Sequence, residues 1–103
     1  MAHWVIWNIP GSVTSLPENI PKMPMPGVPA ANTQQASFGA NEGYAGSGAC
    51  GNVYEFVIYA LSVATFSPTM ATNQGSVRTQ LLALGAQILG TASMRARSLA
   101  PEC

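Results

Sequence analysis

A glycine-rich segment, residues 39–51, is the part of this sequence best suited to contact a small ligand. Glycines leave successive backbone N–H groups uncovered, and such groups can form a concave anion-binding nest. Tyr44 inside the segment and Tyr54 just after it add two phenolic hydroxyl groups that can donate hydrogen bonds. The segment is not a nucleotide-binding P-loop, because it lacks the Gly-Lys-Ser/Thr ending and a strand is predicted to follow it. These residues predict a site for a phosphate or a carboxylate.

The titratable residues offer little for catalysis. All four acidic residues are glutamates, and no two are neighbours: Glu18, Glu42, Glu55 and Glu102. A Ser/His/acid triad would have to use the single histidine, His3, and the sequence has no Gly-x-Ser-x-Gly turn to present the serine. Cys50 and His3 could form a nucleophile pair, but nothing near Cys50 is basic enough to favour its thiolate. We therefore expect a non-enzymatic protein, with a thiol-dependent hydrolase using Cys50 as the enzyme alternative.

The composition describes a small neutral domain. The chain has 103 residues, of which 48% are hydrophobic and only 8% charged. This hydrophobic content excludes disorder, and the length predicts a single domain. Basic and acidic residues cancel, so the chain lacks the electrostatic footprint of a protein that binds nucleic acid or an anionic membrane. So few charges suggest that part of the surface is covered, by a partner subunit or by further chain.

The two cysteines, Cys50 and Cys103, are too few for a disulfide framework and are expected to be unpaired thiols. Together with His3 they give no zinc-ligand spacing, so no metal or cofactor is implied. The longest apolar run, residues 56–64, is too short to span a membrane. Residues 1–9 lack the basic start and cleavage site of a signal peptide. We expect a cytoplasmic protein, or a periplasmic one if an upstream signal segment is missing.

Two segments have the composition of β-strands. Residues 3–9 are rich in Trp, Val and Ile and are apolar on both faces, which predicts a strand covered on both sides in the middle of a sheet. Trp4 and Trp7 are expected to pack in the core or between sheets. Residues 53–61 alternate between two faces and give the strongest strand prediction in the chain.

Long loops rich in proline and glycine are predicted over residues 10–52. Five prolines occur in residues 17–29, and proline cannot donate the hydrogen bonds of a sheet interior, so we expect an extended surface loop. A polyproline ligand for an aromatic groove is the alternative, although the flanking basic anchor is absent. Residues 30–51 are small and polar, and residues 98–103 are expected to form a tail.

One helix is predicted near the end of the chain, over residues 77–89. Ser76 suits the N-cap, a broad apolar stripe follows, and Gly90 suits the position just after the helix. Gly85 interrupts this helix and suggests close packing on a sheet. Residues 91–96 can then return as a short strand.

Several blocks of the sequence resemble one known family. They are His-Trp-Val-Ile-Trp-Asn-Ile-Pro at residues 3–10, Ser-Leu-Pro at 15–17, Gly43-Tyr44-x-Gly46 with Cys50, Tyr-x-Phe-x-x-Tyr-Ala-Leu at 54–61, and residues 81–91. In this order they are similar to the phosphatidylethanolamine-binding protein family. The closest likeness is to its bacterial branch, often called Raf-kinase-inhibitor-like proteins.

The resemblance implies a mostly β fold with one C-terminal helix, in the form of a β-sandwich, and a small pocket for phosphate, phosphorylated head groups or similar anions. The family is not generally catalytic. By this resemblance His3 lines the pocket, the loop from Gly43 to Cys50 forms its wall, and Tyr54 lies on its floor. The ligand-binding residues that we expect are His3, Gly43, Tyr44, Gly46, Cys50, Asn52 and Tyr54.

The chain also departs from the family pattern. Family members are longer and carry an Asp-Pro-Asp-x-Pro motif before the His-Trp block, so the resemblance implies a single partial domain, residues 1–103, lacking the N-terminal part. The family's Gly-Pro-Cys-Pro-Pro loop corresponds to residues 46–51, which contain no proline. A second pocket histidine is replaced by Asn52, whose amide can donate a hydrogen bond but cannot carry charge.

Two functions follow as hypotheses. The first is a binding module that holds a small anion, either phosphate or a phosphorylated head group, and that can modulate a protein partner. The alternative is a structural fragment without a working pocket, whose exposed sheet edges favour a homodimer.

Overall fold

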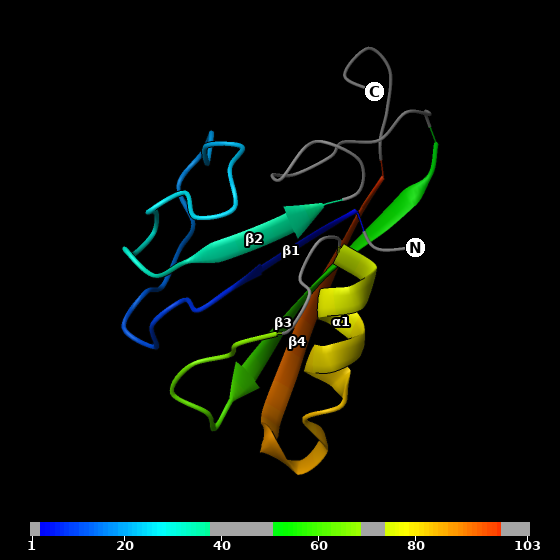
Figure 1. The fold of residues 1–103 in the computed structure, drawn as a ribbon. Coiled ribbons are helices and arrows are strands. Elements are labelled where there is room, and N and C mark those ends of the chain that lie inside the picture. Colours follow the sequence, from blue (N-terminus) through cyan, green and yellow to red (C-terminus); the bar gives the residue numbers. More distant parts are fainter. Residues whose placement is uncertain (1–2, 38–50, 69–73, 98–103) are drawn as a thin grey trace. The chain divides into compact units, whose positions relative to one another are not determined.

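A computed structural model describes residues 3–37, 51–68 and 74–97, and Figure 1 shows a mostly β chain with one α-helix. The elements are β1 (Trp4–Trp7), β2 (Gln34–Ser37), β3 (Val53–Leu61), α1 (Gln74–Leu82), the 3-10 turn η1 (Gly85–Gln87) and β4 (Ile88–Arg97). The chain divides into two compact units, residues 1–45 with 65–83, and residues 46–64 with 84–103. The predicted class, mostly β with one helix, is confirmed.

The first unit contains an antiparallel pair of short strands, β1 and β2. Their register pairs Trp4 with Ser37 and Trp7 with Gln34. β1 lies within the predicted strand but is shorter than residues 3–9, because Asn8 takes a left-handed backbone conformation with φ of 62°. The expected mid-sheet position is not found, since among the described residues this sheet has two strands.

Strand β2 lies inside a segment that was expected to be loop, residues 10–52. Its sequence, Gln-Gln-Ala-Ser, has no hydrophobic alternation and contains no β-branched residue, so local pattern does not predict a strand there. The strand forms because the edge of β1 supplies backbone partners for it. Within this unit Ala36 is fully buried and Gln35 is almost so, which adds packing to the backbone pairing.

The buried hydrophobic side chains among the described residues all belong to the first unit. They are Trp7, Ala36, Phe66, Val77 and Leu81. Helix α1 packs against both β1 and β2, and Val77 and Leu81 supply its buried positions. The rings of Trp7 and Phe66 meet edge to face, with centroids 6.3 Å apart and planes at 78°. The prediction of a packing role for Trp7 is therefore confirmed.

The helix differs from its predicted range of residues 77–89. It begins at Gln74, so Ser76 lies inside its first turn instead of capping it, and it ends at Leu82. Gly85 has φ of 56°, a left-handed conformation that breaks the α-helical geometry at the start of η1 and that glycine adopts at little cost. No atom lies within 4 Å of a Cβ built on Gly85, so close packing is not the reason for a glycine there. Gly90, expected just after the helix, lies in β4.

The second unit contains the antiparallel pair β3 and β4. The bounds of β3, Val53–Leu61, are those predicted, whereas β4, Ile88–Arg97, begins earlier than the expected residues 91–96. The register runs from Val53 opposite Arg97 to Ala60 opposite Gly90, and Leu61 then lies opposite Ile88. Leu89 is therefore the extra residue of a β-bulge.

The proline-rich segment, residues 17–29, forms no helix or strand and is largely exposed, as predicted for a surface loop. A backbone hydrogen bond ties it to β2, because the main-chain N–H of Gln35 donates to the Pro24 carbonyl at 2.9 Å. The peptide bond between Val28 and Pro29 is cis. In the part of the chain that the structure describes, no helix has the length and apolar character needed to cross a membrane.

Candidate functional site

The predicted ligand-binding residues fall in three places. His3 lies directly before β1 in the first unit and is half-buried. Asn52 and Tyr54 lie in the second unit, at the start of β3, where Asn52 is exposed and Tyr54 is half-buried. The remaining predicted contacts lie outside the described residues: Gly43, Tyr44, Gly46 and Cys50. A pocket that joins all these residues stays a prediction.

Strand β1, which His3 directly precedes, is held by the indole groups of its two tryptophans. Trp4 Nε1 donates to Gln35 Oε1 at 2.9 Å, and Trp7 Nε1 donates to Gln34 Oε1 at 2.8 Å. Successive residues of a strand point to opposite faces, so one Trp–Gln hydrogen bond lies on each face of the β1–β2 pair. These bonds anchor both ends of a strand that is only four residues long.

Asn8 anchors the end of β1 to a distant segment. Its Oδ1 accepts a hydrogen bond from the Phe66 amide N–H at 2.8 Å, and its carbonyl lies 3.4 Å from the Thr33 hydroxyl, which donates to it. The left-handed backbone of Asn8 is among the conformations that asparagine tolerates better than other residues with a Cβ. The asparagine of the His-Trp block therefore has a structural role, since it connects β1 to residues far along the chain.

The start of β3 lies beside two arginines that no pattern in the sequence marks as site residues. Arg97 Nη1 donates to the Gly51 carbonyl at 2.7 Å, directly before Asn52. Arg95 Nε lies 3.6 Å from Glu55 Oε2, with both side chains well exposed. The strand register places Arg97 opposite Val53 and Ala96 opposite Tyr54, so Arg97 and Tyr54 occupy opposite faces of the pair. Only the register of β3 with β4 shows this proximity, because 46 residues separate Arg97 from Gly51.

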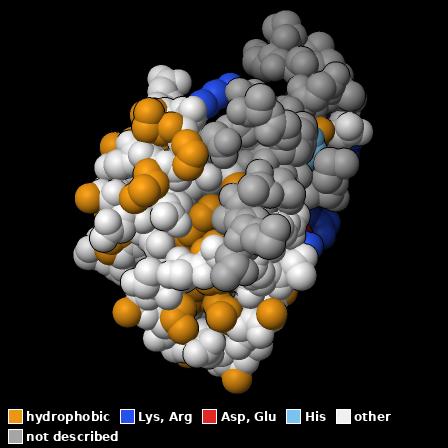
Figure 2. Space-filling model, in the orientation of Figure 1, with side chains coloured by type: hydrophobic (Ala, Val, Ile, Leu, Met, Phe, Trp, Pro, Cys, Tyr) orange, Lys and Arg blue, Asp and Glu red, His pale blue; other side chains and the backbone are white. Residues whose placement is uncertain are grey.

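The chemistry available at these two places is hydrogen bonding and weak electrostatics. Among residues 3–37, 51–68 and 74–97, no three His, Cys, Asp or Glu side chains gather closely enough to hold a metal ion. An imidazole at His3 and an amide, a phenol and a guanidinium near the start of β3 are donors suited to oxygen atoms of an anion. Figure 2 shows that charged side chains are few on the visible face.

Comparison with known proteins gives one match. No curated protein and no solved structure matches the chain. Among models of protein families, that of the phosphatidylethanolamine-binding protein matches residues 1–98, which include β1, β2, β3, α1 and β4. The match covers nearly all of the 103 residues, and it agrees with the order of the sequence blocks described above. The chain therefore belongs to the phosphatidylethanolamine-binding protein family.

Proposed function

We propose that this protein is a non-enzymatic binding module that holds a small anion, either phosphate or a phosphorylated head group. The observation that carries the proposal is membership of the phosphatidylethanolamine-binding protein family over residues 1–98. Supporting it, His3 is the single histidine of the chain and directly precedes a strand that hydrogen bonds hold on both faces. Asn52 and Tyr54 are further uncharged donors that the resemblance implies for the site, and the residues from Gly43 to Cys50, which it also implies, lie outside the described residues.

Titration with phosphate and with phosphoethanolamine tests this proposal. We expect heat of binding by isothermal titration calorimetry, together with a shift of the single histidine Hε1 signal in proton NMR spectra. The variant His3→Ala should lose most of the binding heat, because an imidazole–anion hydrogen bond is among the stronger kinds. Lys22→Gln is the matched control, since it removes an exposed positive charge from the proline-rich loop of the same unit. No heat with the intact chain, or equal loss in both variants, would contradict the proposal.

The finer expectations from the resemblance form part of the same proposal. They are a β-sandwich architecture, a likeness to the bacterial Raf-kinase-inhibitor-like branch, and modulation of a protein partner. The absence of enzymatic activity is also proposed, and Cys50 is the residue to test. Labelling with iodoacetamide at neutral pH should proceed at the rate of an ordinary free thiol, whereas much faster labelling of Cys50 would support a thiol-dependent hydrolase.

A second candidate function, self-association, is favoured by the exposed side chains of the β3–β4 pair. Two-stranded pairs are marginally stable alone in water, and this one exposes Ile58, Leu89 and Met94 by 72%, 69% and 63%. Ile58 and Met94 share one face of the pair, whereas Val53 and Val57 are exposed on the opposite face of β3. We call Ile58, Leu89 and Met94 the exposed ribbon cluster. We propose a second copy of the chain as the partner that covers this cluster.

Sedimentation velocity tests self-association directly. We expect a dimer whose fraction rises with protein concentration and falls in the double variant Ile58→Ser/Met94→Ser. Leu16→Ser is the matched control, because Leu16 is an exposed leucine of the first unit. A monomer at all concentrations would exclude this function, and equal effects of the control and the double variant would exclude the exposed ribbon cluster as the interface.

A further inference from the structure

The side chain of Gln35 uses its carbonyl oxygen and both of its N–H donors in hydrogen bonds within the first unit. It is 2% exposed, and its Oε1 accepts the Trp4 indole N–H at 2.9 Å. Its Nε2 donates to two carbonyls of the proline-rich loop, those of Pro21 at 2.5 Å and of Met23 at 2.9 Å. A glutamine amide has two N–H donors, so both are used here. A buried amide with this set of partners holds its neighbours in one arrangement.

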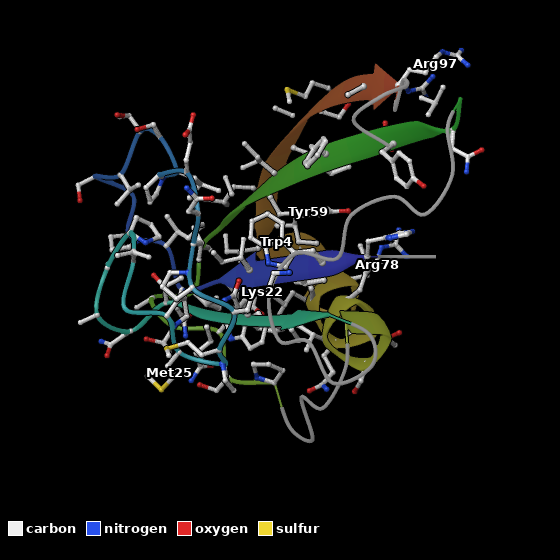
Figure 3. All side chains as sticks on the ribbon, turned by 90° about the horizontal axis from the view of Figure 1, so that it is seen from above. Trp4, Lys22, Met25, Tyr59, Arg78 and Arg97 are labelled. Atoms are coloured by element: carbon white, nitrogen blue, oxygen red, sulfur yellow. The ribbon has the colours of Figure 1, made fainter. Side chains whose placement is uncertain are left out.

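The position of Gln35 in the sheet explains how it reaches Trp4. In the register Gln35 lies opposite Ile6, and Trp4 lies opposite Ser37. Gln35 is therefore the diagonal neighbour of Trp4 on the same face, a separation that long and aromatic side chains can cross. Figure 3 labels Trp4 and Lys22, which mark the two segments that Gln35 connects. Lys22 lies in the loop between Pro21 and Met23, and the carbonyls of these two residues accept hydrogen bonds from Gln35 Nε2.

This connection lies next to His3. Trp4 directly follows His3 in the chain. The hydrogen bond from Gln35 to the Trp4 indole therefore restrains the backbone next to the one that carries the imidazole. Groups that contact a ligand must be held to within a fraction of an ångström, and buried side chains behind them supply this restraint. Gln34, in contrast, binds the indole of Trp7 at the other end of β1.

We infer that Gln35 is a positioning residue for anion binding at His3, an inference that rests on the proposed function. It acts through Trp4 and through the loop carbonyls, and does not itself touch the anion. Removing its amide leaves the Trp4 N–H and two carbonyls without this partner, so the start of β1 becomes less restrained. Removing the amide of Gln34 affects only the far end of the strand.

The matched pair Gln35→Met and Gln34→Met tests the inference, because each change replaces an amide by an apolar chain of similar length. The Hε1 signal of His3 is unambiguous, since the chain has one histidine. We expect Gln35→Met to weaken phosphate binding at His3 by about tenfold, as for residues that orient a ligand-binding histidine. Gln34→Met should bind phosphate within about twofold of the unmodified protein, within the usual context-dependent scatter of distant substitutions.

A second variant, Trp4→Phe, keeps a ring but removes the indole N–H. It should weaken binding in the same direction, and the double variant Trp4→Phe/Gln35→Met should add little to the effect of Gln35→Met alone. This variant decides the question if Gln35→Met does not fold. Equal weakening in Gln35→Met and Gln34→Met, or unchanged binding in folded Gln35→Met and Trp4→Phe, would overturn the inference.

The failure of the proposed function is separable from the failure of this inference. If the unmodified protein shows no response to phosphate, the proposed function fails. The histidine signal without phosphate then reports on positioning by itself: a changed shift or line width in Gln35→Met, but not in Gln34→Met, supports the role of Gln35. An identical signal in the unmodified protein and in these two variants overturns it.

Discussion

Asn8 gives the sharpest stability prediction, because it combines two separable features. Its side-chain Oδ1 accepts the Phe66 amide N–H at 2.8 Å, and its backbone has φ of 62°. Asn8→Gly removes the side-chain acceptor and keeps the left-handed backbone at little strain. Asn8→Ala removes the acceptor and adds the strain of a Cβ, whereas Asn8→Asp keeps an acceptor oxygen.

The expected magnitudes follow from these contacts. Phe66 is a buried residue of the core, so leaving its N–H without a partner should cost about 1–3 kcal/mol in all variants that lack the acceptor. A residue with a Cβ costs about 1–2 kcal/mol in the left-handed conformation. Alanine partly offsets this cost relative to glycine, because it lowers the conformational entropy of the unfolded chain by about 0.4–1 kcal/mol. Asn8→Ala should therefore be less stable than Asn8→Gly by about 0.5–1 kcal/mol, and Asn8→Asp should be the most stable variant.

Urea unfolding followed by tryptophan fluorescence measures these differences, since Trp7 packs against Phe66 and both tryptophans lie in β1. The unfolding free energy of a small protein falls by about 1–2 kcal/mol per molar urea, so a variant that is less stable by about 2 kcal/mol should have its unfolding midpoint lowered by about 1–2 M. Equal stability of the glycine and alanine variants would refute the argument from backbone strain. An aspartate variant as unstable as the alanine variant would refute the argument from the hydrogen bond to Phe66.

Three further predictions concern the core, the turn before β4 and the surface. Phe66→Leu should lower the unfolding free energy by about 1–2 kcal/mol, because it removes an edge-to-face ring contact and some buried volume. Urea unfolding measures this loss, and an unchanged midpoint would contradict the prediction. Gly85→Ala should destabilise the protein by about 1 kcal/mol, because Gly85 has φ of 56°. Gly90→Ala should be neutral or slightly stabilising in thermal melts, since Gly90 has open space for a Cβ and no positive φ. A Gly90→Ala variant less stable than Gly85→Ala would count against the turn geometry. The exposed Glu55–Arg95 pair at 3.6 Å should contribute less than about 1 kcal/mol in a double-mutant cycle, and less still at high salt; a larger coupling that salt does not reduce would show that the pair is covered.

The parts of the fold that the sequence predicts best are those that local alternation and side-chain type dictate. Residues 53–61 alternate between two faces, and the observed β3 has those bounds. The predicted helix extends too far because the apolar residues Leu84, Ala86, Ile88 and Leu89 fit a helical stripe as well as a strand. The left-handed Gly85 breaks the α-helical geometry, and after the 3-10 turn η1 pairing with β3 makes residues from Ile88 onward a strand.

The candidate site divides in the same way. The types and order of residues were enough to place the chain in its family, which the match over residues 1–98 confirms. The choice of His3, Asn52 and Tyr54 as ligand contacts stays a prediction. The amides of Gln34 and Gln35, by comparison, have no special pattern in the sequence. Their partners are indoles about 30 residues earlier, and sequence spacing carries no information about such contacts.

The sequence by itself determined the family, the mostly β class and the strand β3, because composition and alternation act over a few neighbouring residues. Tertiary structure decided where β2 lies, since four residues of low strand propensity become a strand only when β1 offers an edge. It also decided the role of Asn8, whose partner Phe66 is 58 residues away. Hydrogen bonds between distant segments exist only once packing has brought those segments together, and for that reason they are read from the fold.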